Sequence, residues 1–249
     1  MKSRSKFYIL ILVVIFLFSC SNRKSAKIDS FRVRYEKGME LIKKEKYFQA
    51  VDHFTYVVYN SPGSEIADDA QFYLAESHYF LKEYLIAIDE YQRLTRRWPA
   101  SSFADDAKYK IGKSYEKLSP IYERDQIYTV KAINAYQSFV DEYPESELRA
   151  QAETSIKKLR YKLAKKVFDA GKLYMVLREW KAATITFQGV IENYYDTELL
   201  DNTYLEMASC YNKINDKSNM IKTLNEIDPK KITATKDRIR YNNLIDKIK

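Results

Sequence analysis

The sequence is poor in residues that interrupt helices, since its 249 residues include only 5 Gly and 5 Pro. So few glycines leave almost nothing from which to build a loop that cradles phosphate. The sequence also has only 2 His and 2 Cys, and it contains no HExxH, C-x-x-C, Walker or G-x-S-x-G motif. These absences argue against an enzyme, and we expect neither a cofactor nor a metal. Helix formers are abundant and tyrosine occurs 22 times, so we expect helices joined by short turns.

The one long apolar run lies at the N-terminus, where it follows three cations and extends over residues 7–18. Twelve helical residues span about 18 Å, short of the ~30 Å hydrocarbon core of a membrane. Such a run is typical of a signal peptide. The end of the run and the two residues after it form a Leu-Phe-Ser-Cys sequence, residues 17–20, which resembles a bacterial lipobox. We therefore predict a lipoprotein signal peptide over residues 1–19 and lipidation of Cys20. The alternative is an ordinary signal peptide followed by a lone cysteine.

The residues after Cys20 indicate where such an anchor would hold the protein. Residues 20–30 are small, polar and charged, as in a lipidated tether. Ser21 is unlike the Asp that retains lipoproteins in the inner membrane, and no acidic run follows it. This favours the outer membrane, with the protein facing the periplasm. Without residues 1–19 the chain has 39 basic and 34 acidic residues, and so mild an excess argues against nucleic acid as a partner.

An internal repeat organises the rest of the chain. An Ala recurs with an aromatic residue four positions later, in the pairs Ala50/Phe54, Ala87/Tyr91, Ala132/Tyr136 and Ala183/Phe187. A tiny residue stands in the preceding helix each time, at Gly38, Ala75, Gly112 and Gly171. The pattern is that of the tetratricopeptide repeat, a pair of helices in which small side chains let the backbones cross closely and the aromatic ring fills the space toward the next repeat.

The repeats begin at residues 31, 68, 105, 164 and, more weakly, 201. The longest step between two starts contains an eight-residue insertion near 117–128 and an extended helix over 147–163. We expect an all-α, right-handed superhelix of about five helix-turn-helix units. Residues 31–146 would form repeats 1–3, and residues 147–249 the long helix, repeats 4–5 and a C-terminal capping helix. Unrelated amphipathic hairpins are the alternative.

The linkers and the insertion point to a family. Residues 59–64, 98–101 and 143–146 each look like the "YPxS" hinge of BamD, the outer-membrane protein assembly lipoprotein. The insertion carries Arg124-Asp125-Gln126, followed by Thr129 and Ala132, and resembles the "RDQ…T..A" stretch at the same place in that family. The resemblance covers roughly residues 28–228 and includes the lipobox.

The resemblance implies a non-enzymatic subunit of the machine that folds β-barrels into the outer membrane. Its partners would be the periplasmic domains of the barrel-assembly subunit (BamA-like), unfolded outer-membrane protein precursors, and the membrane through the lipid anchor. Two alternatives stay open: another tetratricopeptide envelope scaffold, serving cell-wall synthesis or division, and a glycan-binding lipoprotein.

Two sets of residues are candidate sites for such binding. The fifth position of each repeat faces the groove of such arrays, and with one neighbour it suggests a peptide groove of aromatic rings: Tyr35, Phe72, Tyr79, Tyr109 and Phe168. The alternative is that adjacent helices bury these rings. In the insertion, Arg124 and Asp125 form a candidate partner loop; alternatively, Asp125 caps a helix and Arg124 is solvated. His53, His78 and Cys210 are interpreted as packing residues.

Overall fold

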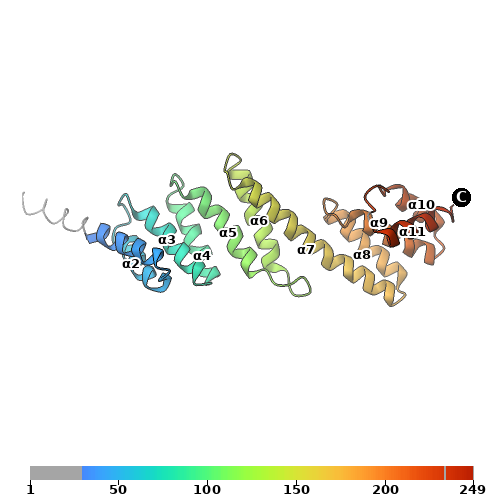
Figure 1. Ribbon diagram of the computed structural model, residues 1–249, viewed down its shortest axis with the longest axis horizontal. Helices are drawn as coiled ribbons and strands as arrows, with labels where there is room; N and C mark the ends of the chain where they lie inside the picture. Colours follow the sequence, from blue (N-terminus) through green and yellow to red (C-terminus); the bar gives the residue numbers. More distant parts are fainter. Residues whose placement is uncertain (1–29, 233, 249) are drawn as a thin grey trace, which may run out of the picture. The chain divides into compact units, whose positions relative to one another are not determined.

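The computed structural model describes residues 30–232 and 234–248 (Figure 1). The predicted signal peptide, Cys20 and all but the last residue of the tether lie outside the described residues. Every regular element in the described part is a helix, and none of these helices is long and apolar enough to cross a membrane. The chain divides into an N-terminal compact unit, up to Tyr115, and a C-terminal compact unit from Glu116 onward.

The N-terminal compact unit is built of helical hairpins. Its elements are a helix over residues 30–43, α2 (Tyr47–Asn60), α3 (Ala67–Phe80), α4 (Tyr84–Arg97) and most of α5 (Ala104–Leu118). Helix α3 packs against both α2 and α4. The core between the first three helices is formed by Leu41, Ala50, Phe54, Val57, Val58, Ala70 and Leu74.

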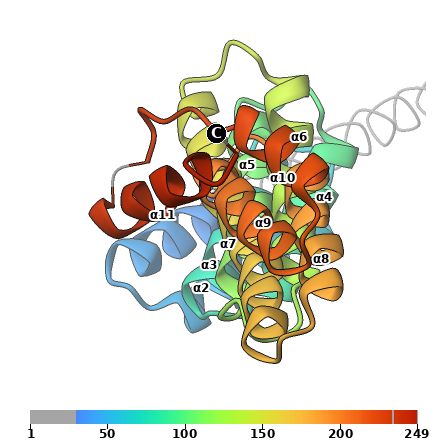
Figure 2. The same cartoon turned by 90° about the vertical axis from the view of Figure 1, so that its right-hand side faces the viewer.

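The C-terminal compact unit continues the pattern with a longer helix. Its elements are α6 (Ile127–Glu142), α7 (Arg149–Val176), α8 (Trp180–Asn193), α9 (Leu200–Lys213), α10 (Lys217–Asn225) and α11 (Thr235–Ile245). Consecutive helices from α6 to α10 pack against one another, and α11 packs on α9 (Figure 2). Helix α7 has 28 residues and includes, without a break, both the segment before repeat 4 and the first helix of that repeat.

The turns inside the repeats confirm the predicted register, including that of the weak fifth repeat. In the part of the chain that the structure describes, four residues other than glycine have a positive φ, between 56° and 64°: Glu45, Lys82, Arg178 and Asn215. Each stands at the fifteenth position of its repeat, between its two helices. The left-handed conformation there reverses the chain within two or three residues. Helices α2, α4, α6 and α8 also end at one shared position, two residues before Pro62, Pro99, Pro144 and Tyr195.

Tiny residues permit the close crossings that the sequence predicts. A Cβ atom added to Gly38 would lie 2.7 Å from the ring of Phe54, and one added to Gly171 would lie 2.5 Å from the ring of Phe187. Each ring is fully buried. The aromatic ring therefore sits directly on the glycine of its own repeat, and these glycines are needed for space rather than for an unusual backbone conformation.

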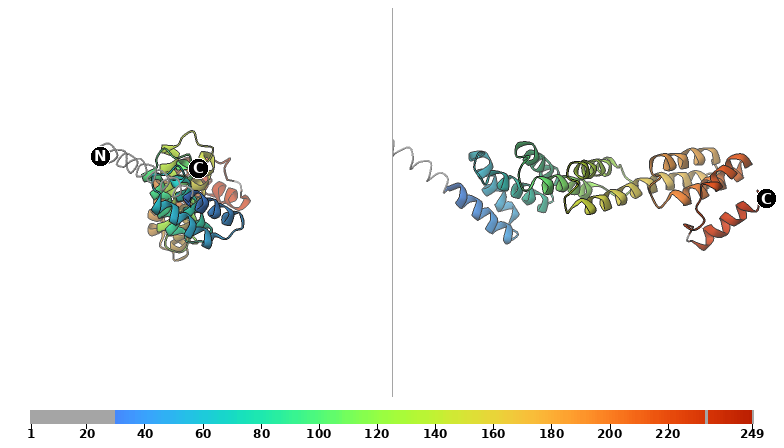
Figure 3. Two further views of the ribbon diagram at one scale, coloured as in Figure 1. Left: turned by 90° about the vertical axis from the view of Figure 1, so that its left-hand side faces the viewer. Right: turned by 90° about the horizontal axis from the view of Figure 1, so that it is seen from above.

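The C-terminal cap is confirmed. The predicted apolar stripe packs into one cluster with α9 and α10, through Tyr241, Leu244 and Ile245 of α11 and Ile248 just beyond it. Helix α11 is the last helix of this compact unit (Figure 3). Cys210, expected in the core, is buried, and burial raises the pKa of its thiol to about 12. A thiol with so high a pKa is protonated at neutral pH and unreactive.

Candidate partner-binding surfaces

The rings of the predicted peptide groove are mostly buried. Phe72, Tyr79, Tyr109 and Phe168 are all less than a tenth exposed, and Tyr35 is half-buried. Phe72 stacks on Phe103, with ring centroids 4.4 Å apart, and Phe168 packs on Phe187 at 5.6 Å. The sequence left open the alternative that the first helices of adjacent repeats pack these rings against one another. The rings are indeed buried, but Phe187 lies on α8, the second helix of the same repeat as Phe168. Peptide binding by these rings stays a prediction, and a peptide could reach little of them.

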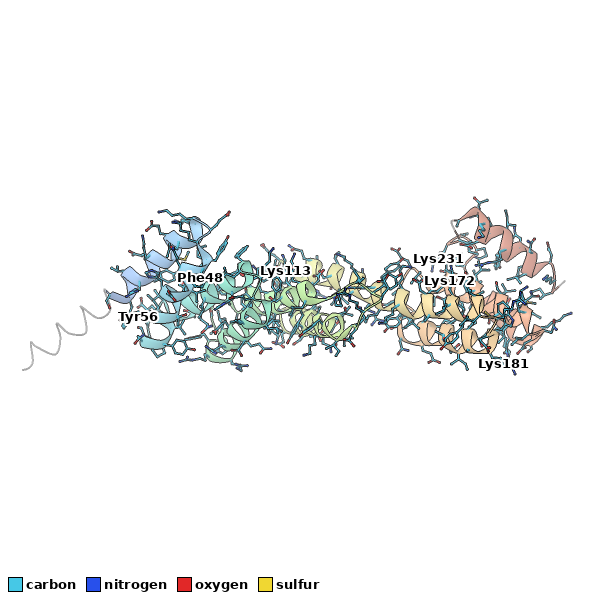
Figure 4. All side chains as sticks on the ribbon, turned by 90° about the horizontal axis from the view of Figure 1, so that it is seen from below. Phe48, Tyr56, Lys113, Lys172, Lys181 and Lys231 are labelled. Atoms are coloured by element: carbon cyan, nitrogen blue, oxygen red, sulfur yellow. The ribbon has the colours of Figure 1, made fainter. Side chains whose placement is uncertain are left out.

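Lysines of the same helix lie over two of these rings. Lys113 Nζ is 5.7 Å from the centre of the Tyr109 ring, and Lys172 Nζ is 5.8 Å from that of Phe168 (Figure 4). Each lysine stands four residues after its ring, so both lie on the same face of a helix. The chain therefore offers lysine ammonium groups at these positions, where the sequence suggested exposed rings.

In the insertion, Asp125 lies at the start of a helix and Arg124 is exposed to solvent, as in the alternative interpretation of these two residues. Asp125 Oδ1 accepts a hydrogen bond from the backbone N–H of Ile127 at 2.9 Å, at the start of α6. The Arg124 residue is exposed, while its backbone carbonyl accepts hydrogen bonds from the chain around it. A role for these two residues in binding a partner stays a prediction.

Sequence reasoning missed the residue that orders the insertion, Gln126. Its side chain is buried and donates to the carbonyl oxygens of Ile121 at 2.8 Å and Arg124 at 2.9 Å. Its Oε1 accepts from the Thr129 hydroxyl at 2.7 Å. The "RDQ…T" pattern therefore has a structural role. The buried Gln126 amide hydrogen-bonds to backbone carbonyl groups of a loop that forms no regular secondary structure.

Lysines of α7 hold the insertion from the other side. Lys166 Nζ donates to the carbonyl oxygen of Arg124 at 2.5 Å, and Lys162 Nζ to the Ser119 hydroxyl at 2.6 Å. Lys165 Nζ lies 5.2 Å from the centre of the Tyr122 ring. The long helix thus does more than join two repeats, since it supplies the surface on which the insertion rests.

Large apolar side chains are exposed along one end of the N-terminal compact unit. We define the aromatic edge as the exposed side chains Phe48, Phe80, Leu85 and Ile86, which lie around the turns inside repeats 1 and 2. Phe48, at the start of α2, is 75% exposed (Figure 4). The ring of Phe80 stacks on Tyr47, with centroids 4.8 Å apart. A monomer rarely leaves such side chains grouped at its surface without a partner.

An ion pair between Lys110 and Glu76 lies next to the Phe80 ring of the aromatic edge. Lys110 Nζ lies 2.6 and 2.8 Å from the two carboxylate oxygens of Glu76, and the hydroxyl of Tyr91 donates to the same carboxylate. Burial and the negative charge of Glu76 raise the pKa of Tyr91 well above its usual value. The same ammonium group lies 5.1 Å from the centre of the Tyr79 ring and 5.9 Å from that of Phe80.

The C-terminal compact unit exposes aliphatic side chains at the corresponding turn. We define the aliphatic edge as Leu173, Val176 and Leu177, at the end of α7, of which Val176 is 78% exposed. Spacings of three and four residues place all three on one helix face. Cationic residues flank them in the chain at Lys172 and Arg178. This edge combines apolar contact with positive charge, whereas the aromatic edge is built around rings.

Comparison with known proteins identifies the family. The family model described as "YfiO: Outer membrane lipoprotein" matches residues 29–226. The chain belongs to this family of outer membrane lipoproteins. A relative, the outer membrane protein assembly factor BamD of Rickettsia prowazekii (strain Madrid E), is 25% identical over 190 residues, which are 76% of each chain. The predicted membership of the YfiO/BamD family is confirmed.

Solved structures similar to this YfiO-family chain are tetratricopeptide-repeat proteins. The TPR2AB-domain:pHSP90 complex of yeast Sti1 is 17% identical, with 88% of this chain and 84% of that chain covered and a TM-score of 0.47. A thermophilic repeat protein of Thermus thermophilus is 14% identical, with 86% and 98% covered and a TM-score of 0.37. The all-α repeat fold is established by the helices and their register.

Proposed function

We propose that this chain is a non-enzymatic lipoprotein subunit of the outer-membrane β-barrel assembly machinery. Lipid on Cys20 would hold it at the periplasmic face of the outer membrane. It would bind the barrel-assembly subunit (BamA-like) and unfolded outer-membrane protein precursors. Family membership and the role named for the Rickettsia relative support this proposal. The observation that carries it is the pair of exposed apolar edges, one on each compact unit.

The aromatic edge suits an unfolded precursor. Such a chain presents many different apolar and aromatic side chains, so a surface that holds it must tolerate sequence variation. Exposed rings meet this need because each offers a large contact area at low entropic cost. Phe48 and Phe80 are the two exposed rings of this edge.

The aliphatic edge suits a folded partner. Three branched or aliphatic side chains on one helix face make a fixed, shape-specific contact, and the neighbouring cations would add orientation to it. We assign this edge to the barrel-assembly subunit. The two binding tasks then lie on separate compact units.

Docking is tested by co-purification from solubilised membranes. With Val176→Asp and Leu177→Asp together, the tagged full-length protein should retain less than a tenth of the barrel-assembly subunit, because two carboxylates would replace the apolar contact. The matched control is Ile239→Asp, a 56% exposed isoleucine on α11 in the same compact unit. Undiminished recovery with the double variant, folded by circular dichroism, would remove the aliphatic edge as the docking site. Capture of a cell-wall or division protein in place of the barrel subunit would instead support the scaffold alternative.

Precursor binding is tested with a fluorescent peptide from the last strand of a barrel. Each exposed ring should contribute on the order of 1–2 kcal/mol, so Phe48→Ser with Phe80→Ser should weaken binding at least tenfold. Val33→Ser is the control, since Val33 is 63% exposed in the same compact unit but outside the edge. Equal affinity of the double variant and the control would contradict this assignment.

A further inference from the structure

Within the C-terminal compact unit, the insertion and α7 enclose a pocket of about 620 Å³. Residues 119–123 of the insertion form one wall, and the other wall includes Lys158, Leu159, Tyr161, Lys162 and Lys165. The side of the pocket formed by the insertion is held in place by hydrogen bonds from Gln126 and Lys166. A preformed site lowers the entropic cost of binding.

Two of the lysines at this pocket are weakly compensated. Lys162 Nζ donates to Ser119, and no carboxylate of the described residues lies within 4 Å of it. Lys158 is 78% exposed at its side chain, and the carboxylate paired with it, Glu116, is 3.9 Å away. That carboxylate also accepts a hydrogen bond from the Tyr136 hydroxyl at 2.7 Å.

The lining of the pocket carries three lysines and two glutamates, a net charge of +1 before the pairing of Lys165 with Asp169 is counted, and its cations all come from α7. Lys165 is paired with Asp169 at 2.8 Å, and Glu116 and Glu123 line the pocket beside the three lysines. Helix α7 as a whole carries eight cationic and two acidic side chains, a net charge of +6. Burial, with the nearby charge of Lys158, lowers the pKa of Lys162 below its usual value, while Glu116 acts in the opposite direction. An added anion would favour the ammonium form.

The rest of the pocket is apolar. Leu159 is almost fully buried at its base, while Ile121, 62% exposed, and Tyr161, 38% exposed, belong to its walls. These surfaces would accept a large apolar side chain next to the anionic group. A free phosphate or a lipid headgroup would leave them uncovered.

We propose that this pocket binds an acidic segment of a partner protein, with an Asp or Glu carboxylate between Lys158 and Lys162 and a neighbouring apolar side chain against Ile121 and Tyr161. The site is distinct from both exposed edges. It provides a third contact surface, whose lysines would select a partner segment that combines an acidic residue with an apolar one.

The test uses a fluorescein-labelled nonapeptide, with two Glu flanking a central Phe in a Gly/Ser background, and its counterpart with Gln in place of Glu. Binding to the full-length protein is measured by anisotropy at low salt. The Glu peptide should bind at least tenfold more tightly than the Gln peptide. Lys158→Met and Lys162→Met should each weaken its binding at least fivefold. Lys157→Met should change it less than twofold, because Lys157 is exposed next in the chain but does not line the pocket.

Three results would overturn the proposal: equal binding of the two peptides, equal losses for Lys157→Met and Lys158→Met, or capture of phosphatidylglycerol vesicles in a Lys158-dependent manner without peptide binding. The last would assign the lysines to a membrane surface. If the Lys162→Met protein does not fold, the Lys158→Met protein alone tests the proposal, since the Lys158 side chain is mostly exposed and its replacement should not disturb the fold. The Val176→Asp, Leu177→Asp variant should retain peptide binding, so failure here is distinguishable from failure of the docking assignment.

Discussion

The two compact units share one repeat register but differ in what they expose and in how they pair buried charge. The N-terminal compact unit exposes rings and encloses the Glu76–Lys110 pair, in which both side chains are less than a fifth exposed. The C-terminal compact unit exposes the aliphatic edge and pairs Arg240, whose side chain is 32% exposed, with Glu206, whose side chain is 8% exposed. The comparison shows that the repeat specifies the crossings and turns, whereas the positions outside that register determine the chemistry of each surface.

The largest expected effect concerns the buried charge pairs. Lys110→Met should lower the free energy of unfolding by about 3 kcal/mol, because it leaves the Glu76 carboxylate buried without its cation. Arg240→Met should cost somewhat less, about 2 kcal/mol: the Glu206 side chain is only 8% exposed, but Arg240 is 32% exposed, so water can enter where its guanidinium was. Urea unfolding followed by circular dichroism measures both.

A double variant sharpens this contrast. Replacing Glu76 and Lys110 together by Met removes both charges, so it should cost less than half as much as Lys110→Met alone. A double variant as unstable as the single one would mean that the packing of the lysine stem, rather than its charge, is what the unit requires.

The next effect concerns the glycine crossings. Gly171→Leu should destabilise by roughly 1–3 kcal/mol, since even its Cβ would lie 2.5 Å from the Phe187 ring. Gly38→Leu should act similarly in the other compact unit, where the distance is 2.7 Å. Gly189→Leu is the control: it has nothing within 4 Å of its added Cβ, and Leu favours a helix over Gly, so it should be neutral or stabilising. Thermal melts of the three variants rank them; an unchanged melt for Gly171→Leu would contradict the register.

The smallest effect lies in the turns inside the repeats. Lys82 and Asn215 both have left-handed backbones, with φ of 64° and 60°. Asn tolerates this conformation better than Lys. Lys82→Gly should therefore stabilise by about 0.5–1 kcal/mol, and Asn215→Gly by close to zero. Chemical unfolding measures the change in the free energy of unfolding for each variant. Equal changes would show that Lys and Asn are equally strained in this left-handed backbone conformation.

The fold could be predicted from the sequence because its determinants are local and periodic. Gly38 with Phe54, and Gly171 with Phe187, meet at a fixed spacing, so the spacing alone predicts the crossing. The surfaces could not be predicted in the same way. Phe72 and Phe48 are both aromatic, but one is buried by Phe103 and the other is exposed, and that difference depends on neighbours from another helix. The pocket depends on side chains about forty residues apart, such as Ser119 and Lys162.

Site-specific photocrosslinking tests most directly the claim that the two compact units hold different partners. A photoreactive phenylalanine analogue is placed at position 48 or at position 176 of the full-length lipoprotein in cells that are assembling barrels. We predict that position 48 captures unfolded barrel precursors and position 176 captures the barrel-assembly subunit. Capture of the same partner at both positions, or the reverse assignment, would contradict the division of tasks between the two edges.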